Sequence, residues 1–200
     1  AVDATYGSQN VWTNGFQGVW HLQGNYNDST ANGYNLSAGT APSSTSSGKI
    51  GGAYDFEHSS NQYIERSNAS SSNLKIRGSQ TITGWIKPES AVDAGTWGLA
   101  TMRDYSTGGG WSVQFNKGTV VTLVKDGLNS HQFINYTTSN PSNGEWSFIH
   151  GIYDSSAQLL KAGYNGNYLS TSASGTSTTP TVAFDIGGYV DGAGHNGYFD

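Results

Sequence analysis

The strongest structural signal in the chain is the alternating stretch Gly144-Glu145-Trp146-Ser147-Phe148-Ile149-His150-Gly151-Ile152-Tyr153-Asp154. A period of two places successive side chains on opposite faces of a strand, so Trp146 and every second residue up to Ile152 share one face. After the polar turn 154–156, a second short strand ends at Asn165-Gly166. Asn-Gly favours a type I′ turn, because both central residues of that turn need positive φ. Residues 144–166 therefore predict two antiparallel strands followed by a tight turn.

The rest of the chain alternates short apolar stretches with turn residues. Strands are predicted at residues 16–22, 49–57, 63–65, 79–87, 98–102, 110–116, 120–125, 132–137, 167–170 and 181–186, and loops at 25–47, 67–75, 172–179 and 191–197. In the strand 79–87, Ile82 and Ile86 share one face and Trp85 lies on the other. Many short strands between turns predict an all-β protein, a two-sheet antiparallel β-sandwich.

An ordered set of motifs accompanies the central stretch. Its members are Gly18-Val19-Trp20-His21-Leu22, Asp28-Ser29-Thr30 with Asn32-Gly33, Gly52-Ala53-Tyr54-Asp55-Phe56, Thr83-Gly84-Trp85-Ile86-Lys87-Pro88, Tyr164-Asn165-Gly166, Ile186-Gly187-Gly188 and Gly197-Tyr198-Phe199-Asp200. Together they resemble the laminin-G-like domain of the concanavalin A-like jelly-roll superfamily. The resemblance covers residues 16–200 and implies a jelly roll. Because this fold serves many functions, it implies the architecture far more than the activity.

The length of 200 residues fits a single domain. Residues 16–200 are expected to form the sandwich, and the polar residues 1–15 a linker or an edge strand; in the resembled family such a segment joins a neighbouring domain. The family pattern also has a last strand after the position of Tyr198-Phe199-Asp200. We therefore expect either that the domain is cut before this strand or that another chain donates one to the open edge.

The composition points to an extracellular or cell-surface protein. Charged residues make up 12% of the chain, and Ser, Thr, Asn and Gly take their place. The net charge is −5, and the nine Lys and Arg residues are scattered, whereas nucleic-acid binding requires a basic patch. The sequence has no cysteine and no apolar run long enough to insert into a membrane. These features argue against nucleic-acid and membrane partners.

The sequence offers little for catalysis. It contains no Gly-x-Ser-x-Gly and no His-Glu-x-x-His motif. A glycoside hydrolase needs two carboxylates across a cleft, and the one close pair, Asp55 and Glu57, equally fits a solvated strand face. His150 is expected to be a half-buried strand residue. We therefore expect no enzyme activity.

Calcium is a better candidate than catalysis. The turn 25–29 offers carboxylate, amide and carbonyl oxygens, which are the ligands that Ca²⁺ prefers. The resemblance implies a structural calcium that ties the first acidic turn to a closing segment, and Asp28 and Asp200 match those positions. The alternatives are an Asx turn at Asp28, without a metal, and a strand-end acid at Asp200.

Sugar binding requires aromatic platforms with polar neighbours, and binding residues often lie on loops. The candidates around the glycine loop 108–110 are Trp97, Arg103, Asp104 and Tyr105; a second set is Tyr164, Tyr168, Tyr189 and His195. Trp111 alternates with apolar residues and is expected in the core. The expected function is non-catalytic binding of a glycan or a protein partner, with calcium support. The alternative is a structural spacer or assembly unit of a surface appendage.

Overall fold

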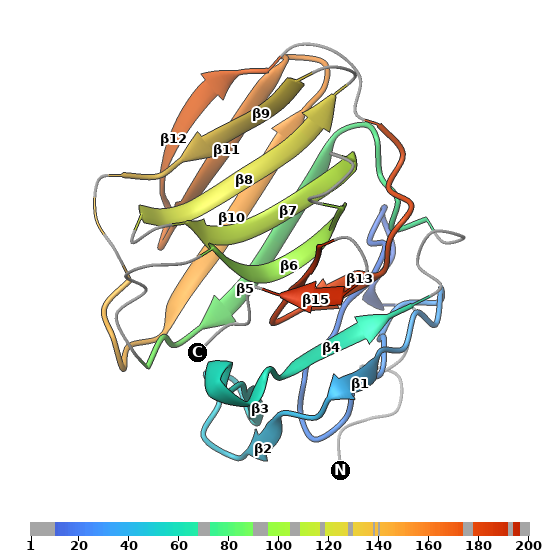
Figure 1. The fold of residues 1–200 in the computed structure, drawn as a ribbon, viewed down its shortest axis with the longest axis vertical. Helices are drawn as coiled ribbons and strands as arrows, with labels where there is room; N and C mark the ends of the chain where they lie inside the picture. Colours follow the sequence, from blue (N-terminus) through green and yellow to red (C-terminus); the bar gives the residue numbers. More distant parts are fainter. Residues whose placement is uncertain are drawn as a thin grey trace.

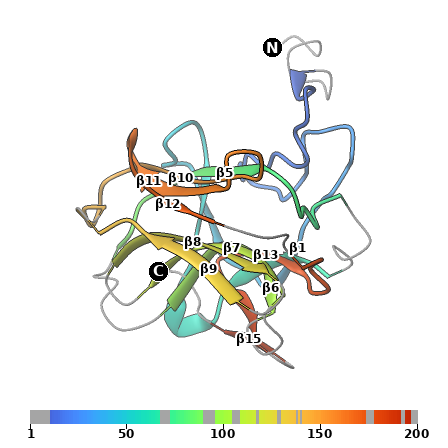
Figure 2. The same ribbon diagram turned by 90° about the horizontal axis from the view of Figure 1, so that it is seen from above.

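The computed structural model describes residues 11–67, 73–89, 96–104, 109–116, 119–127, 130–137, 139, 141–173, 178–191 and 194–196 (Figure 1). The regular structure of the described chain is almost all β-strand; the strands pair antiparallel, apart from one parallel bridge between β14 and β6, and pack as two layers (Figure 2). This confirms the predicted all-β sandwich. No helix among the described residues is long and apolar enough to cross a bilayer.

The larger sheet has the strand order β1-β4-β13-β6-β7-β8-β9, with β14 beside β6 and β15 beside β14. Its strands are β1 (Ser37–Thr40), β4 (Tyr63–Arg66), β6 (Thr96–Asp104), β7 (Gly109–Asn116), β8 (Thr119–Gly127), β9 (Ser130–Asn135), β13 (Phe184–Ile186), β14 (Tyr189–Asp191) and β15 (Gly194–Asn196). A separate ribbon pairs β2 (Ser43–Thr45) with β3 (Ala53–Asp55), and the short 3-10 helix η2 (His58–Ser60) follows it.

The smaller sheet has the order β12-β11-β10-β5. Its strands are β5 (Gln80–Ile86), β10 (Ser147–Asp154), β11 (Leu159–Tyr164) and β12 (Asn167–Ser172). The predicted turn between β11 and β12 is confirmed, since Asn165 has φ of 50° and Gly166 has φ of 83°. Asn165 also holds the end of β10, because its side-chain Oδ1 accepts a hydrogen bond from the Phe148 N–H at 2.8 Å.

Two apolar clusters fill the sandwich. In the first, β7 and β9 of the larger sheet meet β10 and β11 of the smaller one through Val113, Phe115, Ile134, Ile149 and Leu160. The second surrounds Trp111, which is 3% exposed as predicted, and includes Ile64, Met102 and Phe184. Fully burying one such side chain contributes about 1.5–3 kcal/mol to folding. Ile149 and Tyr153 therefore fix which face of β10 points inward.

Three local predictions were wrong. Residues 16–22 form no strand but one isolated bridge, Trp20 to Asp28, and Leu22 has a φ of 56°. The predicted loop 25–47 contains β1 and β2, and β15 lies in the predicted loop 191–197. These short strands consist largely of Ser, Thr, Gly and other polar residues, so their hydrogen bonds to neighbouring strands form them rather than intrinsic propensity.

Gly163 of β11 offers a test of how closely β12 packs against it. A Cβ atom at this position would lie 1.9 Å from the Asn167 carbonyl oxygen and 2.7 Å from the Tyr168 Cα. We expect Gly163→Ala to lower the free energy of unfolding by about 1–3 kcal/mol, measured by urea denaturation. The matched control is Gly84→Ala in β5, where nothing lies within 4 Å of the added Cβ. Equal stability of the two variants would contradict this packing.

Candidate functional site

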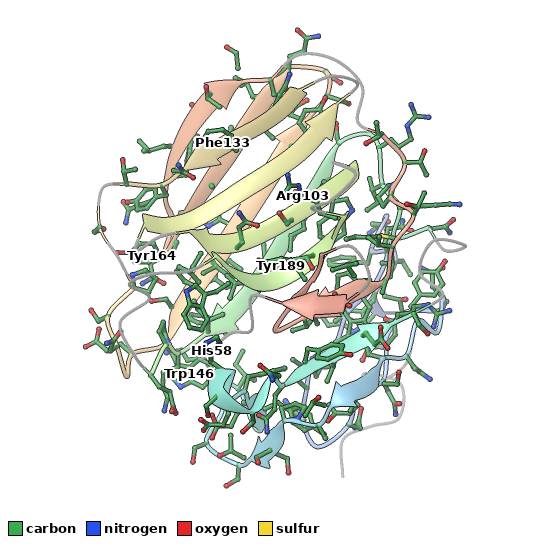
Figure 3. All side chains as sticks on the ribbon, viewed as in Figure 1. His58, Arg103, Phe133, Trp146, Tyr164 and Tyr189 are labelled. Atoms are coloured by element: carbon green, nitrogen blue, oxygen red, sulfur yellow. The ribbon has the colours of Figure 1, made fainter. Side chains whose placement is uncertain are left out.

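The structure does not gather the predicted ligand residues in one place. Trp97 and Arg103 lie six residues apart on β6, about 20 Å along an extended strand. Trp97 packs against the first apolar cluster and its ring contacts His58, with the centroids 4.3 Å apart. Arg103 is 7% exposed and lies over the larger sheet, away from His58 (Figure 3). Asp104 is the last residue of β6, and Tyr105 lies outside the described residues.

The outer face of the larger sheet is polar but closed over β6. Thr101, Ser112 and Asp185 lie side by side on this face and are 0–1% exposed. The chain leaving β13 crosses here: the Thr101 hydroxyl donates a hydrogen bond to the Gly188 carbonyl at 2.9 Å. Figure 2 shows β15 on the side of this sheet that faces away from the smaller one. The centre of the face is therefore covered by the protein's own chain.

Asp28, the predicted calcium ligand, is 7% exposed and satisfied by its own turn. Its Oδ1 accepts hydrogen bonds from the N–H groups of Val19 and Thr30, and its Oδ2 from the Tyr34 N–H and the Thr30 hydroxyl, at 2.7–3.0 Å. A carboxylate has about four lone-pair sites, and these donors fill them. These bonds fit the Asx-turn alternative, and calcium binding by Asp28 stays a prediction. Asp200 lies outside the described residues.

Replacing Asp28 tests whether its carboxylate stabilises the turn through these hydrogen bonds or binds calcium. Asp28→Asn puts a donor opposite two of the four donors, so we expect a loss of about 2–4 kcal/mol in unfolding free energy. The control is Asp154→Asn, whose Oδ1 accepts N–H bonds in the exposed turn after β10 and should cost less than about 1.5 kcal/mol. Urea denaturation with calcium and with chelator is the measurement. A calcium-induced gain that disappears in Asp28→Asn would show instead that Asp28 binds the metal.

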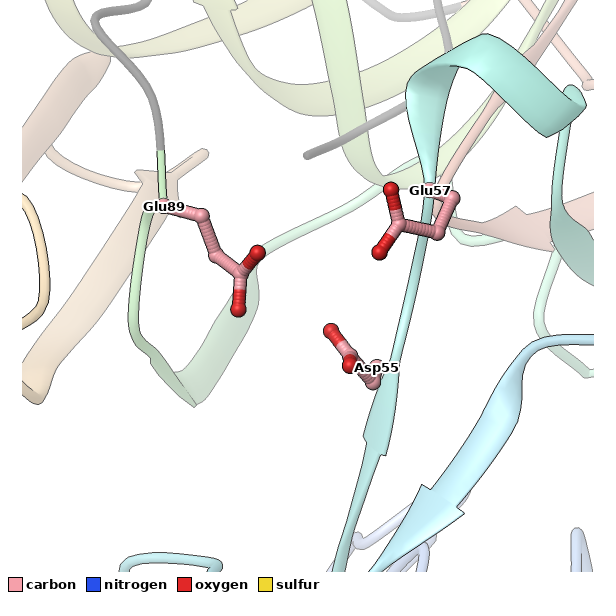
Figure 4. A group of neighbouring side chains, drawn as sticks. All are labelled: Asp55, Glu57 and Glu89. Carbon is pink, nitrogen blue, oxygen red and sulfur yellow. The ribbon is translucent and has the colours of Figure 1, made fainter.

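A group of three carboxylates lies apart from Asp28, near the end of β5. Asp55, Glu57 and Glu89 bring one oxygen each to within 4.8 Å of one another, from β3, the start of η2 and the chain after β5 (Figure 4). The sequence pairs Asp55 with Glu57 but gives no sign of Glu89, which only the fold brings near. Oxygen ligands of this kind suit a hard cation, and exposed acids also gather without one.

The outer face of the smaller sheet carries rings instead. Residues of β10 point alternately in and out: Ile149 and Tyr153 face the core, whereas Phe148, His150 and Ile152 face away. Trp85 lies directly across from Phe148, with ring centroids 5.2 Å apart, and Tyr168 lies edge-on to His150 at 6.4 Å. We call this surface, made of Trp85, Trp146, Phe148, His150, Ile152 and Tyr168, the aromatic face. Its members lie on or beside β5, β10 and β12, and β11 contributes Gly163 between them.

Gly163 makes this arrangement possible. It separates His150 from Tyr168 in the register of β10, β11 and β12. Because glycine has no side chain, the Tyr168 ring reaches across β11 toward the imidazole. Tyr168 is 53% exposed and Trp85 is 41% exposed, so both rings remain open to solvent. Figure 2 shows the smaller sheet as the outer strand layer on its side of the sandwich, with the loop between β2 and β3 extending past it.

Lysine side chains lie over the rings. The Lys49 ammonium is 5.0 Å from the Trp85 ring centroid, and the Lys161 ammonium 5.1 Å from that of Tyr168. Just past the ends of β5 and β10, Lys87 lies 6.0 Å from the Trp146 ring. These lysines are far apart in the chain, so the scattered basic residues of the sequence gave no sign that the fold groups them.

His150 makes the stability of this face depend on pH. It is 9% exposed, and burial lowers its pKa below the ordinary value of 6.5. The folded state therefore binds this proton less readily than the unfolded chain. The contribution of neutral His150 to the free energy of unfolding is complete above about pH 6.5. It is lost as the pH falls through the lowered pKa.

We expect the unfolding free energy of the wild type to fall more steeply than that of His150→Gln between about pH 7 and about pH 5. Urea denaturation at each pH gives the two slopes. The control is His21→Gln, because His21 is exposed on a loop outside the smaller sheet. Parallel curves for the wild type and His150→Gln would refute the assignment.

Solved structures share this fold. Domain 4 of AbnA, a GH43 extracellular arabinanase from Geobacillus stearothermophilus in complex with arabinotriose, has a TM-score of 0.59 at 18% identity, over 88% of this chain and 84% of that one. The CBM40 of a Ruminococcus gnavus IT-sialidase, bound to α2,3 sialyllactose, has a TM-score of 0.54 at 9% identity, over 68% and 78%.

A third match is botulinum neurotoxin type C, whose cell entry depends on interaction with two ganglioside molecules. Its TM-score is 0.59 at 14% identity, over 86% of this chain and 42% of that one. The chain spans about two fifths of the first toxin chains it matches, 40% of one and 42% of the other. No family profile and no curated protein matches the sequence. The protein has the concanavalin A-like jelly-roll fold, as the motifs predicted.

The alternation in the sequence predicted that Trp85 lies on the face of its strand away from Ile82 and Ile86. It also predicted that Trp146, Phe148 and His150 share one face. Both placements agree with the structure. It did not join the two sets into one surface, because the pairing of β5 with β10 was not predicted. That register, Phe148 opposite Trp85, is what assembles the aromatic face.

Proposed function

We propose that the protein is a non-catalytic binding module that recognises a glycan through the aromatic face. The observation that carries this is the exposure of large rings on a regular sheet: Trp85 is 41% and Tyr168 is 53% exposed, although both belong to ordered strands. A pyranose has one apolar face that stacks on aromatic rings, and its hydroxyls bond to polar groups beside them. The exposed hydroxyls of Thr83 and Ser170 lie on strands of the same sheet.

The comparisons support this proposal without locating a site. Two of the matched domains were solved with sugars bound, arabinotriose and sialyllactose, and both are similar to most of this chain in fold. A module of this kind acts at an extracellular or cell-surface location, beside neighbouring domains of a longer chain, and these features are part of the proposal. Calcium support also belongs to it and stays a prediction, as does the absence of glycosidase activity.

The second candidate function is an assembly unit of a surface appendage. It is favoured by β12, which lies at the edge of the smaller sheet with all six residues exposed. An open strand edge can pair with a strand of another chain. Light scattering separates the candidates, because strand exchange gives a mass that rises with protein concentration, whereas a glycan-binding module stays monomeric without its ligand.

The proposal predicts which substitutions weaken binding of the protein to a glycan array. Trp85→Ala and Tyr168→Ala should each weaken binding to the best sugar by at least about tenfold, equivalent to about 1.4 kcal/mol. The control is Phe133→Ala, a ring of the larger sheet that is 55% exposed and lies outside the aromatic face. If both ring variants bind as the wild type does, the site lies elsewhere. If the wild type binds no sugar at all, the assembly candidate replaces the glycan candidate.

A further inference from the structure

The charge of the aromatic face differs from that of the whole chain. The chain has a net charge of −5, yet Lys49, Lys87 and Lys161 all lie over rings of this face. Within the described strands of the smaller sheet, the one carboxylate is Asp154, at the far end of β10. Its Oδ1 accepts hydrogen bonds from the N–H groups of Ser156 and Ala157. The ring-bearing part of these strands therefore has no carboxylate of its own while three ammonium groups lie over its rings; Glu145 and Glu89 lie in the adjoining chain beyond the strand ends.

We infer that the aromatic face binds an anionic glycan whose sugar units each carry one carboxylate. This inference rests on the proposed glycan-binding function and specifies its ligand. The rings contribute stacking, which every pyranose can accept, and the ammonium groups contribute the selection for negative charge. The net charge of the chain repels anions from most of its surface, so an anionic polymer is drawn to this face rather than to its surroundings.

The simpler explanation is that the lysines only cover the rings. A cation–π contact at an exposed site is weak, and it leaves the charge of the ammonium without a counter-ion. Within the described part of the chain, none of the three lysines has a carboxylate partner. Trp85 and Tyr168 also remain about half exposed beneath them. The contacts thus hold flexible cations above open rings, and a carboxylate on a stacked sugar completes both interactions.

The ratio of charge to rings indicates the density of negative charge on the ligand. Each lysine is paired with its own ring, Lys49 with Trp85, Lys87 with Trp146 and Lys161 with Tyr168. One ionic contact for each stacking contact fits a sugar with a single carboxylate. A polymer with several sulfates on each sugar requires more cations than the face supplies. The four strands span about 14 Å at the usual strand spacing, so the ligand is an oligosaccharide rather than one sugar.

A matched pair of probes tests the charge. A short oligogalacturonate and its methyl ester have the same rings and differ in the carboxylates. We expect the wild type to bind the free acid at least about fivefold more tightly than the ester, by isothermal titration at low salt. The preference should disappear near 1 M salt, where the screening length falls to about 3 Å. Polyglutamate and dextran sulfate are the other two probes, for charge without sugar rings and for dense sulfate.

Variants assign the effect to the lysines. Lys49→Gln combined with Lys161→Gln should weaken binding of the acid by roughly tenfold and leave binding of the ester unchanged. Lys75→Gln is the control, because Lys75 lies on the loop before β5, next to Leu74 of the second apolar cluster. All of these substitutions are at the surface, and equal unfolding midpoints confirm that each variant folds.

The outcomes are distinct. Tighter binding of the acid, lost in the double variant, supports the inference. Equal binding of acid and ester overturns it and leaves the glycan-binding function intact. Equal or tighter binding of polyglutamate or dextran sulfate overturns the choice of a carboxylated sugar. Binding of none of the probes and of no sugar on the array overturns the proposed function itself. A dimer that Trp85→Ala abolishes shows that a second copy of the chain covers the face.

Discussion

The register of β10 between its two neighbours is the constraint on which the rest of the structure depends. Phe148 pairs with Trp85 on one side, and His150 pairs with Gly163 on the other. Side chains alternate along a strand, so a slip of one residue would turn Ile149 and Tyr153 to solvent and put His150 in the core. The buried set on one face and the Asn165-Gly166 turn together exclude that slip. Core and aromatic face are therefore two consequences of one register.

The two sheets use their outer faces in opposite ways. Over β6 the larger sheet presents Thr101, Ser112 and Asp185, and the chain after β13 closes above them, so their polar groups are buried. The smaller sheet presents rings and has no layer of strands above it among the described residues. Burying rings and exposing hydroxyls is the usual arrangement for stability alone. The reversed arrangement suggests that the exposed rings serve binding.

Asp28 holds the first acidic turn of the chain through hydrogen bonds to both of its carboxylate oxygens. The turn that resembles a calcium-binding segment is held by four hydrogen bonds to one carboxylate, which is a sufficient reason for an acid at that position. The same bonds fix the bridge between Trp20 and Asp28, so that Trp20 stacks on Phe184 with centroids 4.9 Å apart. In this protein the turn anchors the first segment of the chain to the second apolar cluster.

The sequence by itself determined the strands whose signal is local: alternation in β5 and β10, and the Asn-Gly turn, depend only on neighbouring residues. It also determined which residues of those strands share a face. Only the tertiary structure decided what lies beside what. The pairing of β5 with β10 joins segments about sixty residues apart, and the approach of Lys49 and Glu89 to their partners follows from loops. Polar strands such as β1 and β15 escaped prediction because long-range hydrogen bonds form them. Trp97 and Arg103, close in sequence, are kept apart by the extended backbone of β6.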